Sequence, residues 1–311
     1  MLKYGNFNQQ YINTVFKTTE GYFDPYNYES QNDHDKKSII DNRRKGIPKI
    51  GKNYVYEFVM IPNDSFLNEN HQLPPGVELK ICLDRLPAEY SVYKVRTEGE
   101  DTLKGKALEL KNVYAQVEYV SSTALRHYHD SINMTPLEYN YDECSIICKS
   151  LPQGEQFIRM ENLKGGNTPD YLFIGVVPTE GVNGSTNASP INFKNYGIKE
   201  INLSLNGNPC HGYPIQIQND YPLLPYVKML EVLGRNQNTQ LPAQINMAQF
   251  AENMIFAHKF EGEDSSQGWL GVCLSIAETS GFTEAYTLVL WTVHNVKTTI
   301  DKFHMVEKYN L

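Results

Sequence analysis

Short alternations of hydrophobic and polar residues recur along this chain, and they predict a protein built of β-strands. Apolar side chains fall at alternate positions in residues 77–83 and 113–120, as in strands with one wet face. Residues 54–61 are rich in the β-branched and aromatic side chains that strands favour, and Pro62 ends that run. The N-terminal half is therefore expected to contain several strands.

The C-terminal half carries stronger strand patterns. Residues 171–177 are apolar throughout, as expected of a strand covered on both faces. Residues 198–205 alternate again and lead into Asn206 and Gly207, a pair that tolerates positive φ and predicts a tight hairpin. Further strands are expected in three more β-rich or apolar runs, at 144–148, 269–276 and 286–293.

Helical patterns are scarce. Residues 225–234 are the best candidate, because they begin with a proline and end with a glycine. The apolar face of this helix is expected to comprise Val227, Leu230 and Leu233. A shorter helix is predicted over residues 122–129.

Long polar loops separate the predicted elements, and no repeat of solenoid or propeller period is present. Many strands, few helices and long loops leave a β-sandwich, a barrel or a jelly roll. The polar stretch 97–106 is interpreted as a connection between an N-terminal region, residues 1–98, and a C-terminal unit, residues 99–311. The predicted fold class is all-β.

Composition narrows the class of protein. With 41% hydrophobic and 21% charged residues the chain is globular, and its 21 Tyr against 2 Trp suit half-buried strands and protein interfaces. The net charge of −8 argues against a dedicated nucleic-acid site. The one local basic run, Arg43, Arg44 and Lys45, is interpreted as a solvated loop.

The cysteines and the hydropathy of the chain indicate the cellular compartment in which the protein is made. The 5 cysteines are odd in number and irregularly spaced, which predicts no disulfide framework and favours a reducing compartment. The N-terminus has no secretory-signal pattern, and no apolar run approaches the length of a membrane helix. We expect a soluble protein made in the cytosol.

The richest polar cluster contains His127, His129 and Asp130. Two histidines and a carboxylate can hold a metal, but no third ligand recurs at a recognisable spacing, so a solvent-exposed edge is the favoured interpretation. Cys210 and His211 are adjacent, and neighbours on a strand point to opposite faces, so they are poorly placed to form a nucleophile and base.

Paired carboxylates occur at Asp142 and Glu143 and again in residues 261–264. Acid–base catalysis needs one member with a perturbed environment, and these stand in polar settings that predict solvation. The chain also lacks the P-loop, nucleophile-elbow and dinucleotide motifs. We therefore predict no catalytic, cofactor-binding or metal residues, no cofactor, and no enzyme activity.

Three stretches of the chain carry distinctive motifs. The first, 62–81, contains a Leu-Pro-Pro-Gly-Val turn before a strand. The second, 171–207, has a strand, an Asn-Phe-Lys-Asn-Tyr loop at 192–196, another strand and an Asn-Gly turn. The third starts at Tyr226 with a helix-like segment and ends with closing strands near Asn295. Together they span about residues 3–306, and in content and order they resemble the capsid proteins of Polinton (Maverick) elements and the related adintoviruses.

The resemblance implies a double jelly-roll capsid subunit of a virus or virus-like transposable element, located in the virion. In that family two eight-stranded rolls stand side by side, and homotrimers tile a shell with neighbouring capsomers. The family has additional strands before the segment that 1–21 resembles. The expected fold is therefore one complete C-terminal roll plus a partial or reduced N-terminal roll. A single-roll, penton-like minor subunit is a further alternative.

Residues 1–93 contain only two expected strands, 54–61 and 77–83, too few to close a sandwich. Proteins rarely leave sheet edges open, and strand addition from a neighbour satisfies such edges. We hypothesise that another chain completes this region. Its aromatic anchors would form the oligomer interface: Tyr11, Phe16, Tyr22, Phe23, Tyr26 and Tyr28. Alternatively, these side chains pack on the chain's own second roll.

Jelly rolls also serve as lectins and as cupin enzymes, so the fold alone proves no function. A receptor- or carbohydrate-binding jelly roll, such as a spike or penton-like protein, is therefore an alternative, since tyrosines also stack on sugars. A cupin-like metalloenzyme that uses His127 and His129 is a third, ranked well behind the others.

Overall fold

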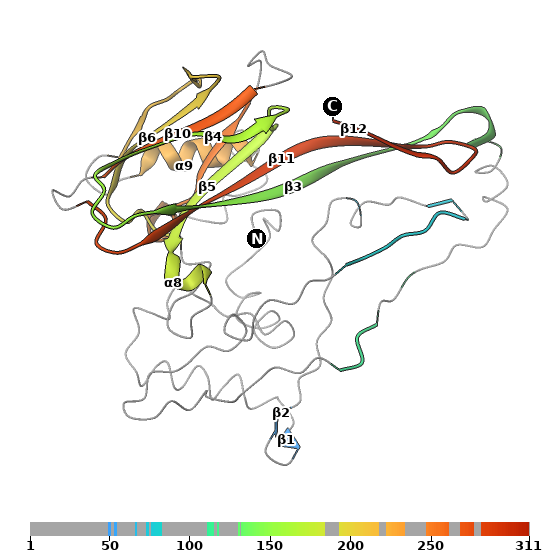
Figure 1. The fold of residues 1–311 in the computed structure, drawn as a ribbon, viewed down its shortest axis with the longest axis horizontal. Coiled ribbons are helices and arrows are strands. Elements are labelled where there is room, and N and C mark those ends of the chain that lie inside the picture. Colours follow the sequence, from blue (N-terminus) through green and yellow to red (C-terminus); the bar gives the residue numbers. More distant parts are fainter. Residues whose placement is uncertain are drawn as a thin grey trace.

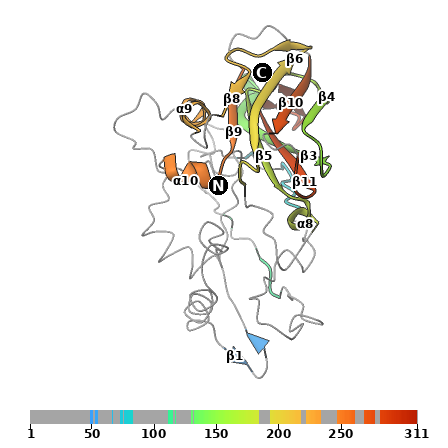
Figure 2. The same ribbon diagram turned by 90° about the vertical axis from the view of Figure 1, so that its left-hand side faces the viewer.

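The described residues of the computed structural model are 49–50, 53–54, 66, 73–74, 76–82, 111–114, 117, 130, 132–183, 193–217, 222–233, 247–260, 268–276 and 281–310. They form two five-stranded antiparallel sheets that face each other, and a separate two-stranded pair (Figures 1 and 2). The strands are β1 (Lys49–Ile50), β2 (Asn53–Tyr54), β3 (Leu137–Leu151), β4 (Phe157–Gly166), β5 (Tyr171–Pro178), β6 (Ile198–Leu205), β7 (Asn208–Pro209), β8 (Ile215–Gln216), β9 (Phe256–Lys259), β10 (Gly268–Ile276), β11 (Tyr286–Ile300) and β12 (Val306–Asn310); the helices are α8 (Thr179–Val182), α9 (Leu223–Val232) and α10 (Met247–Glu252).

The strand order is that of a jelly roll. One sheet has the order β3-β11-β5-β9, and the facing sheet has the order β4-β10-β6-β8. Successive strands β3, β4, β5 and β6 alternate between the two sheets, and the chain returns through β8, β9, β10 and β11 in the complementary positions. Eight strands wound in this way make one complete roll. The all-β prediction is confirmed.

The core lies between the two sheets and is almost entirely aliphatic and aromatic. Strand β6 shows the reason, because Ile201, Leu203 and Leu205 point inward while the residues between them are partly exposed. Strand β5 is apolar on both faces, as the sequence predicts. Facing side chains that are almost fully buried include Leu172, Ile174, Leu288 and Leu290 from one sheet and Ile201, Leu203, Leu270 and Leu274 from the other.

The predicted Asn-Gly hairpin is confirmed. Asn206 and Gly207 both have positive φ, 53° and 80°, and Leu205 pairs with Asn208 directly across this two-residue turn. The Asn206 side chain also accepts a hydrogen bond from the backbone N–H of Trp269, at 2.9 Å. Asn206 therefore joins the turn to β10.

Helix α9 closes the edge of the sandwich beside β8 and β9 (Figure 2). It starts two residues before the predicted position and ends at Val232. Pro225 and Met229 form its buried face, whereas Val227, which we expected on that face, is 36% exposed. The prediction of the helix is confirmed, but the orientation assigned to Val227 was wrong.

Two predicted strands do not form at the positions that the structure describes. Of the predicted strand 77–83, the structure describes residues 77–82, and none of them is in a strand. Of the predicted strand 113–120, it describes Val113, Tyr114 and Val117, which are also outside any strand and are at least 57% exposed. Alternation gives a segment one apolar face, but a strand also needs a neighbour for its backbone N–H and C=O groups, and no ladder joins these residues to a described strand. The predicted helix at 122–129 and the stretch 97–106 lie outside the described residues.

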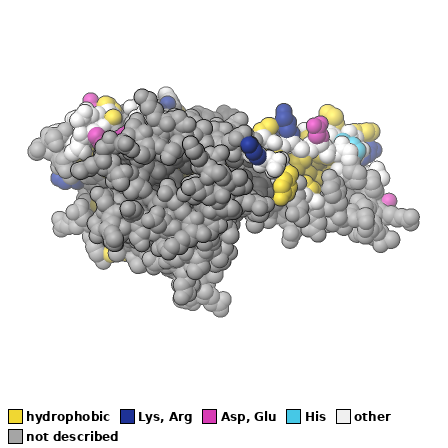
Figure 3. Space-filling model, turned by 90° about the horizontal axis from the view of Figure 1, so that it is seen from below, with side chains coloured by type: hydrophobic (Ala, Val, Ile, Leu, Met, Phe, Trp, Pro, Cys, Tyr) yellow, Lys and Arg dark blue, Asp and Glu magenta, His cyan; other side chains and the backbone are white. Residues whose placement is uncertain are grey.

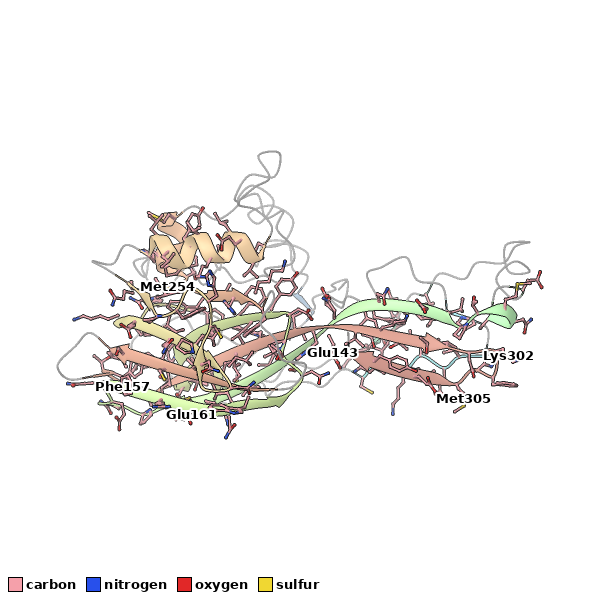
Figure 4. All side chains as sticks on the ribbon, turned by 90° about the horizontal axis from the view of Figure 1, so that it is seen from above. Glu143, Phe157, Glu161, Met254, Lys302 and Met305 are labelled. Atoms are coloured by element: carbon pink, nitrogen blue, oxygen red, sulfur yellow. The ribbon has the colours of Figure 1, made fainter. Side chains whose placement is uncertain are left out.

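Strands β3 and β11 extend far beyond the sandwich. Both have 15 residues and pair along their whole length, about 50 Å. Residues 286–293 of β11 also pair with β5, whereas residues 296–300 pair with β12. Residues 137–143, 294–300 and 306–310 thus form a three-stranded projection, here called the ribbon (Figures 1 and 4). The sequence pattern predicts that β11 ends at residue 293, whereas the strand continues to Ile300.

Candidate interaction surfaces

The outer face of the β3-β11-β5-β9 sheet is apolar. Ile146, Trp291 and Phe173 lie opposite one another on three adjacent strands. They lie on the face of the sheet opposite to that of their neighbours Leu172 and Leu290, which point into the core between the sheets. A sheet in a two-layer sandwich usually presents polar side chains outward. This face is therefore suited to contact with a further layer.

Part of that layer comes from Phe193. Its ring packs edge-on against Trp291, with 5.1 Å between the ring centroids, and together with Val177 and Val289 it forms a small cluster separate from the main core. Gly175 makes room for the ring. On β3 the same face remains open, since Ile146 is 60% exposed and Cys144 and Cys148 are also exposed.

The outer face becomes charged where the ribbon begins, whereas the inner face still holds buried side chains. On the outer face, Lys297 forms an ion pair with Glu138, with 2.7 Å between Nζ and Oε1. On the inner face, Tyr139, Val296 and Ile300 are buried although the facing sheet does not extend beneath them. The inner face of the ribbon therefore has a covering of its own.

Phe66 supplies part of this covering. Its ring centroid lies 5.9 Å from that of Tyr139 and 5.2 Å from that of Tyr141. Closer to the tip, Gly76 lies against the imidazole of His304, where an added Cβ would be 3.0 Å from Cε1. Residues from the N-terminal third thus contact the ribbon of the same chain.

Polar side chains on the inner face are joined to one another across the strands. Within the ribbon, the hydroxyl of Tyr141 lies 3.0 Å from that of Thr298; just before it begins, the hydroxyls of Ser145 and Thr292 are 2.7 Å apart. Lys308 donates to both carboxylate oxygens of Glu143, at 2.8 and 2.7 Å. The ribbon is held by hydrogen bonds between side chains as well as by its ladder.

The β11–β12 turn presents apolar side chains to solvent. One carboxylate oxygen of Asp301 accepts hydrogen bonds from the backbone N–H groups of Phe303 and Met305, each at 2.8 Å. The turn is therefore ordered, yet Phe303 is 73% exposed and Met305 is 63% exposed. Figure 3 shows hydrophobic side chains beside basic and acidic side chains along the ribbon.

The structure describes only some of the candidate residues for chemistry. His127, His129 and residues 261–264 lie outside the described residues, and Asp130 is exposed. Cys210 is buried whereas His211 is exposed, and neither lies on a strand, although the prediction assumes one. In the described part of the chain, no three His, Cys, Asp or Glu side chains are grouped so that they could hold a metal ion.

None of the five cysteines forms a disulfide. Burial raises the pKa of the Cys273 thiol, which lies opposite Arg159 on β4; the positive charge of Arg159 lowers that pKa, and the carboxylate of Glu161 raises it. Among the described residues, no helix has both the length and the apolar character needed to cross a membrane. The six N-terminal aromatic residues predicted as interface anchors lie outside the described residues.

The strand order thus defines a jelly-roll protein. Comparison of the sequence with known proteins does not assign it to a family within that class. No protein-family profile matches the sequence. A Caenorhabditis elegans protein, described as uncharacterized protein F54H12.2, is 32% identical over 95 residues, which cover 30% of this chain and 23% of that protein. The chain therefore matches under a quarter of that relative's length.

Solved structures with similarity to this chain include viral capsid proteins. The mavirus major capsid protein superposes with a TM-score of 0.33 and 12% identity, covering 56% of this chain and 41% of that chain. A chain of the Sputnik virophage superposes with a TM-score of 0.36 and 13% identity, covering 56% and 39%. These superpositions are too loose to decide function, and the jelly-roll assignment rests on the strand order.

Proposed function

We propose that this protein is a structural capsid subunit of a virus or virus-like transposable element, and that its oligomers tile a shell. The observation that carries the proposal is the apolar surface outside the core: Ile146 on the outer sheet face, Leu224 on α9, and Phe303 at the ribbon tip are all at least 46% exposed. Soluble monomers rarely leave large apolar areas uncovered, and such areas mark interaction sites. A subunit surrounded by neighbours covers several of them at once.

The sequence resemblance to Polinton and adintovirus capsid proteins suggests which partners would cover this apolar surface. It supports a homotrimer in contact with neighbouring capsomers, a place in the virion, and synthesis in the host cytoplasm. The eight-stranded roll is the scaffold that this role requires, because its rigid sheets leave the loops and the ribbon to meet other subunits. The protein would act without a cofactor or a catalytic centre.

We further propose that residues 1–98 form a partial first roll or an assembly region, and that residues 99–311 contain the second roll. The contacts of Phe66 with Tyr139 and Tyr141 support a first region that rests on the ribbon. Its oligomer contacts would come from the predicted anchors: Tyr11, Phe16, Tyr22, Phe23, Tyr26 and Tyr28. A second chain would complete this region.

Light scattering and electron microscopy of the purified protein test the proposal directly. We expect trimers or closed particles without added ligand. A monodisperse monomer at all concentrations would exclude the capsid role, and a monomer retained on a glycan column would indicate a carbohydrate-binding protein. Limited proteolysis tests the domain boundary, since the first cut is expected within 97–106; early cuts inside 171–177 would contradict it.

A further inference from the structure

Helix α9 has two apolar faces, and only one of them is buried against the rest of the chain. Pro225 and Met229 are buried against the sandwich. Leu223, Leu224 and Val227 lie on the opposite side of the helix and are 50%, 46% and 36% exposed. The apolar face of a helix is normally buried against another element. The outward face of α9, defined by these three residues, therefore has the character of a buried surface.

That outward face carries one charge. Glu231 follows Val227 by four residues, so it lies on the same side of the helix, and it is exposed. The only other charged residue of α9 is Lys228, whose ammonium lies 5.6 Å from the centre of the Tyr213 ring. The outward face is thus apolar with a single carboxylate at its C-terminal end.

The ribbon tip has the complementary composition. Phe303 and Met305 are exposed apolar groups on a turn already ordered by the Asp301 carboxylate, so little backbone conformational entropy remains to be lost on binding. Lys302 is exposed and lies over the Phe303 ring, 5.1 Å from its centroid. The Asp301 carboxylate keeps its negative charge but faces the backbone of the turn, so Lys302 is the charged side chain that lies beside the exposed Phe303.

The outward face of α9 and the ribbon tip lie at opposite ends of the molecule. Helix α9 packs on β9 at the sandwich, whereas the tip is at the far end of the ribbon (Figures 1 and 4). The half of β11 that projects beyond β5 alone measures roughly 25 Å. A tip therefore cannot reach the α9 of its own chain, and two different patches that fit each other join copies either reciprocally about a two-fold axis or head to tail.

We infer that the ribbon tip of one copy docks on the outward face of α9 of a second copy, with Phe303 and Met305 against Leu223, Leu224 and Val227, and with Lys302 beside Glu231. The inference deepens the proposed capsid function and rests on it for its biological setting. A contact of this kind closes into a ring when the rotation between copies allows it, and otherwise extends into an open array.

Charge reversal tests the predicted ion pair. Lys302→Glu and Glu231→Lys should each weaken self-association in sedimentation velocity by about two- to fivefold, as expected of an exposed pair, and the protein with both changes should regain the original association. Phe303→Ser should weaken it by about tenfold or more. Lys149→Glu, a charge reversal at another exposed site, is the control and should change nothing.

Cross-linking tests the contact itself. In a background with the exposed Cys82, Cys144 and Cys148 changed to serine, one preparation carries Phe303→Cys and another carries Leu224→Cys. Oxidation of the mixture should give at least fivefold more disulfide dimer than a mixture of Leu224→Cys with Phe157→Cys, whose parent side chain is 59% exposed on β4. Dimer at the level of the control would overturn the inference.

The outcomes separate this inference from the capsid proposal. Particles formed by the wild-type protein, together with no 303–224 cross-link, would leave the capsid role standing and refute the docking contact. A specific cross-link without trimers or particles would support the contact and refute the capsid role. Failure of both experiments would refute both.

Discussion

The ring of Phe193 lies directly on the backbone of Gly175. A Cβ atom at Gly175 would be 2.5 Å from Cδ1 and 2.9 Å from Cε1 of that ring, closer than real Cβ atoms approach. The contact fixes the loop that follows α8 to the outer face of β5, beside Trp291. Glycine at this position therefore serves close packing, because nothing larger fits beneath the ring.

Gly175→Ala should lower the free energy of unfolding by about 1–3 kcal/mol, since the added methyl group overpacks the Phe193 contact. Chemical denaturation with urea measures the change. Gly165→Ala is the matched control in a strand, because a Cβ there meets nothing within 4 Å. Equal stabilities of the two variants would show that the ring moves aside without cost.

The Asn206 side chain has two roles that two substitutions separate. Asn206→Gly keeps the positive φ but loses the hydrogen bond from the Trp269 N–H, and should cost about 1 kcal/mol. Asn206→Ala loses the bond and also places a less tolerant residue at φ 53°, and should cost about 1–2 kcal/mol more. Urea titration of both variants provides the measurement. A glycine variant less stable than the alanine variant would exclude the turn as the source of the effect.

Phe66→Ala should loosen the ribbon more than the sandwich. The substitution removes two ring contacts with Tyr139 and Tyr141, each worth roughly 0.5–1.5 kcal/mol. Hydrogen exchange followed by mass spectrometry should show faster exchange in residues 137–143 and 294–300, with little change in β6. Phe157→Ala, at an exposed aromatic position on the other sheet, is the control. Unchanged exchange in the ribbon would mean that Phe66 does not stabilise it.

The cysteines should differ in reactivity. Burial raises the pKa of the Cys273 thiol, so at pH 8 a smaller fraction is thiolate than for an exposed thiol, and only the thiolate attacks an alkylating reagent. Iodoacetamide at pH 8 should therefore modify Cys144 and Cys148, which are exposed, faster than Cys273. Peptide mass spectrometry gives the rates, and in urea the difference should vanish. Labelling of Cys273 in the folded protein as rapid as that of Cys144 would contradict its partial burial.

Local patterns predicted much of the roll. The run at 198–205, the Asn-Gly pair and the apolar run at 171–177 each specify their structure through side-chain alternation or turn chemistry, and each is confirmed. Strand β4 was missed because a bulge interrupts its alternation opposite Leu270 and Val272. Strand β9 was missed because four residues carry too little periodicity to be recognised.

The surfaces were harder to predict than the core. Alternation in β11 continues through Val296, Thr298 and Ile300, and those β-branched residues could have revealed the ribbon. In contrast, the segment 113–120 has the pattern of a strand but no described partner, and only the tertiary structure supplies that information. The exposure of Phe303 likewise depends on how Asp301 folds the turn, which periodicity does not encode.

The unbroken pairing of β3 with β11 has a mechanical consequence. Its backbone hydrogen bonds lie across the strand direction, and the pairing continues without a register shift from Tyr286–Leu151 to Ile300–Leu137. A pull along β11 from the tip therefore loads these bonds in shear and all together, rather than peeling them open one at a time. Tension applied at the far end of the projection is carried into the centre of the sandwich, so the β3–β11 pair behaves as a tether as well as a spacer.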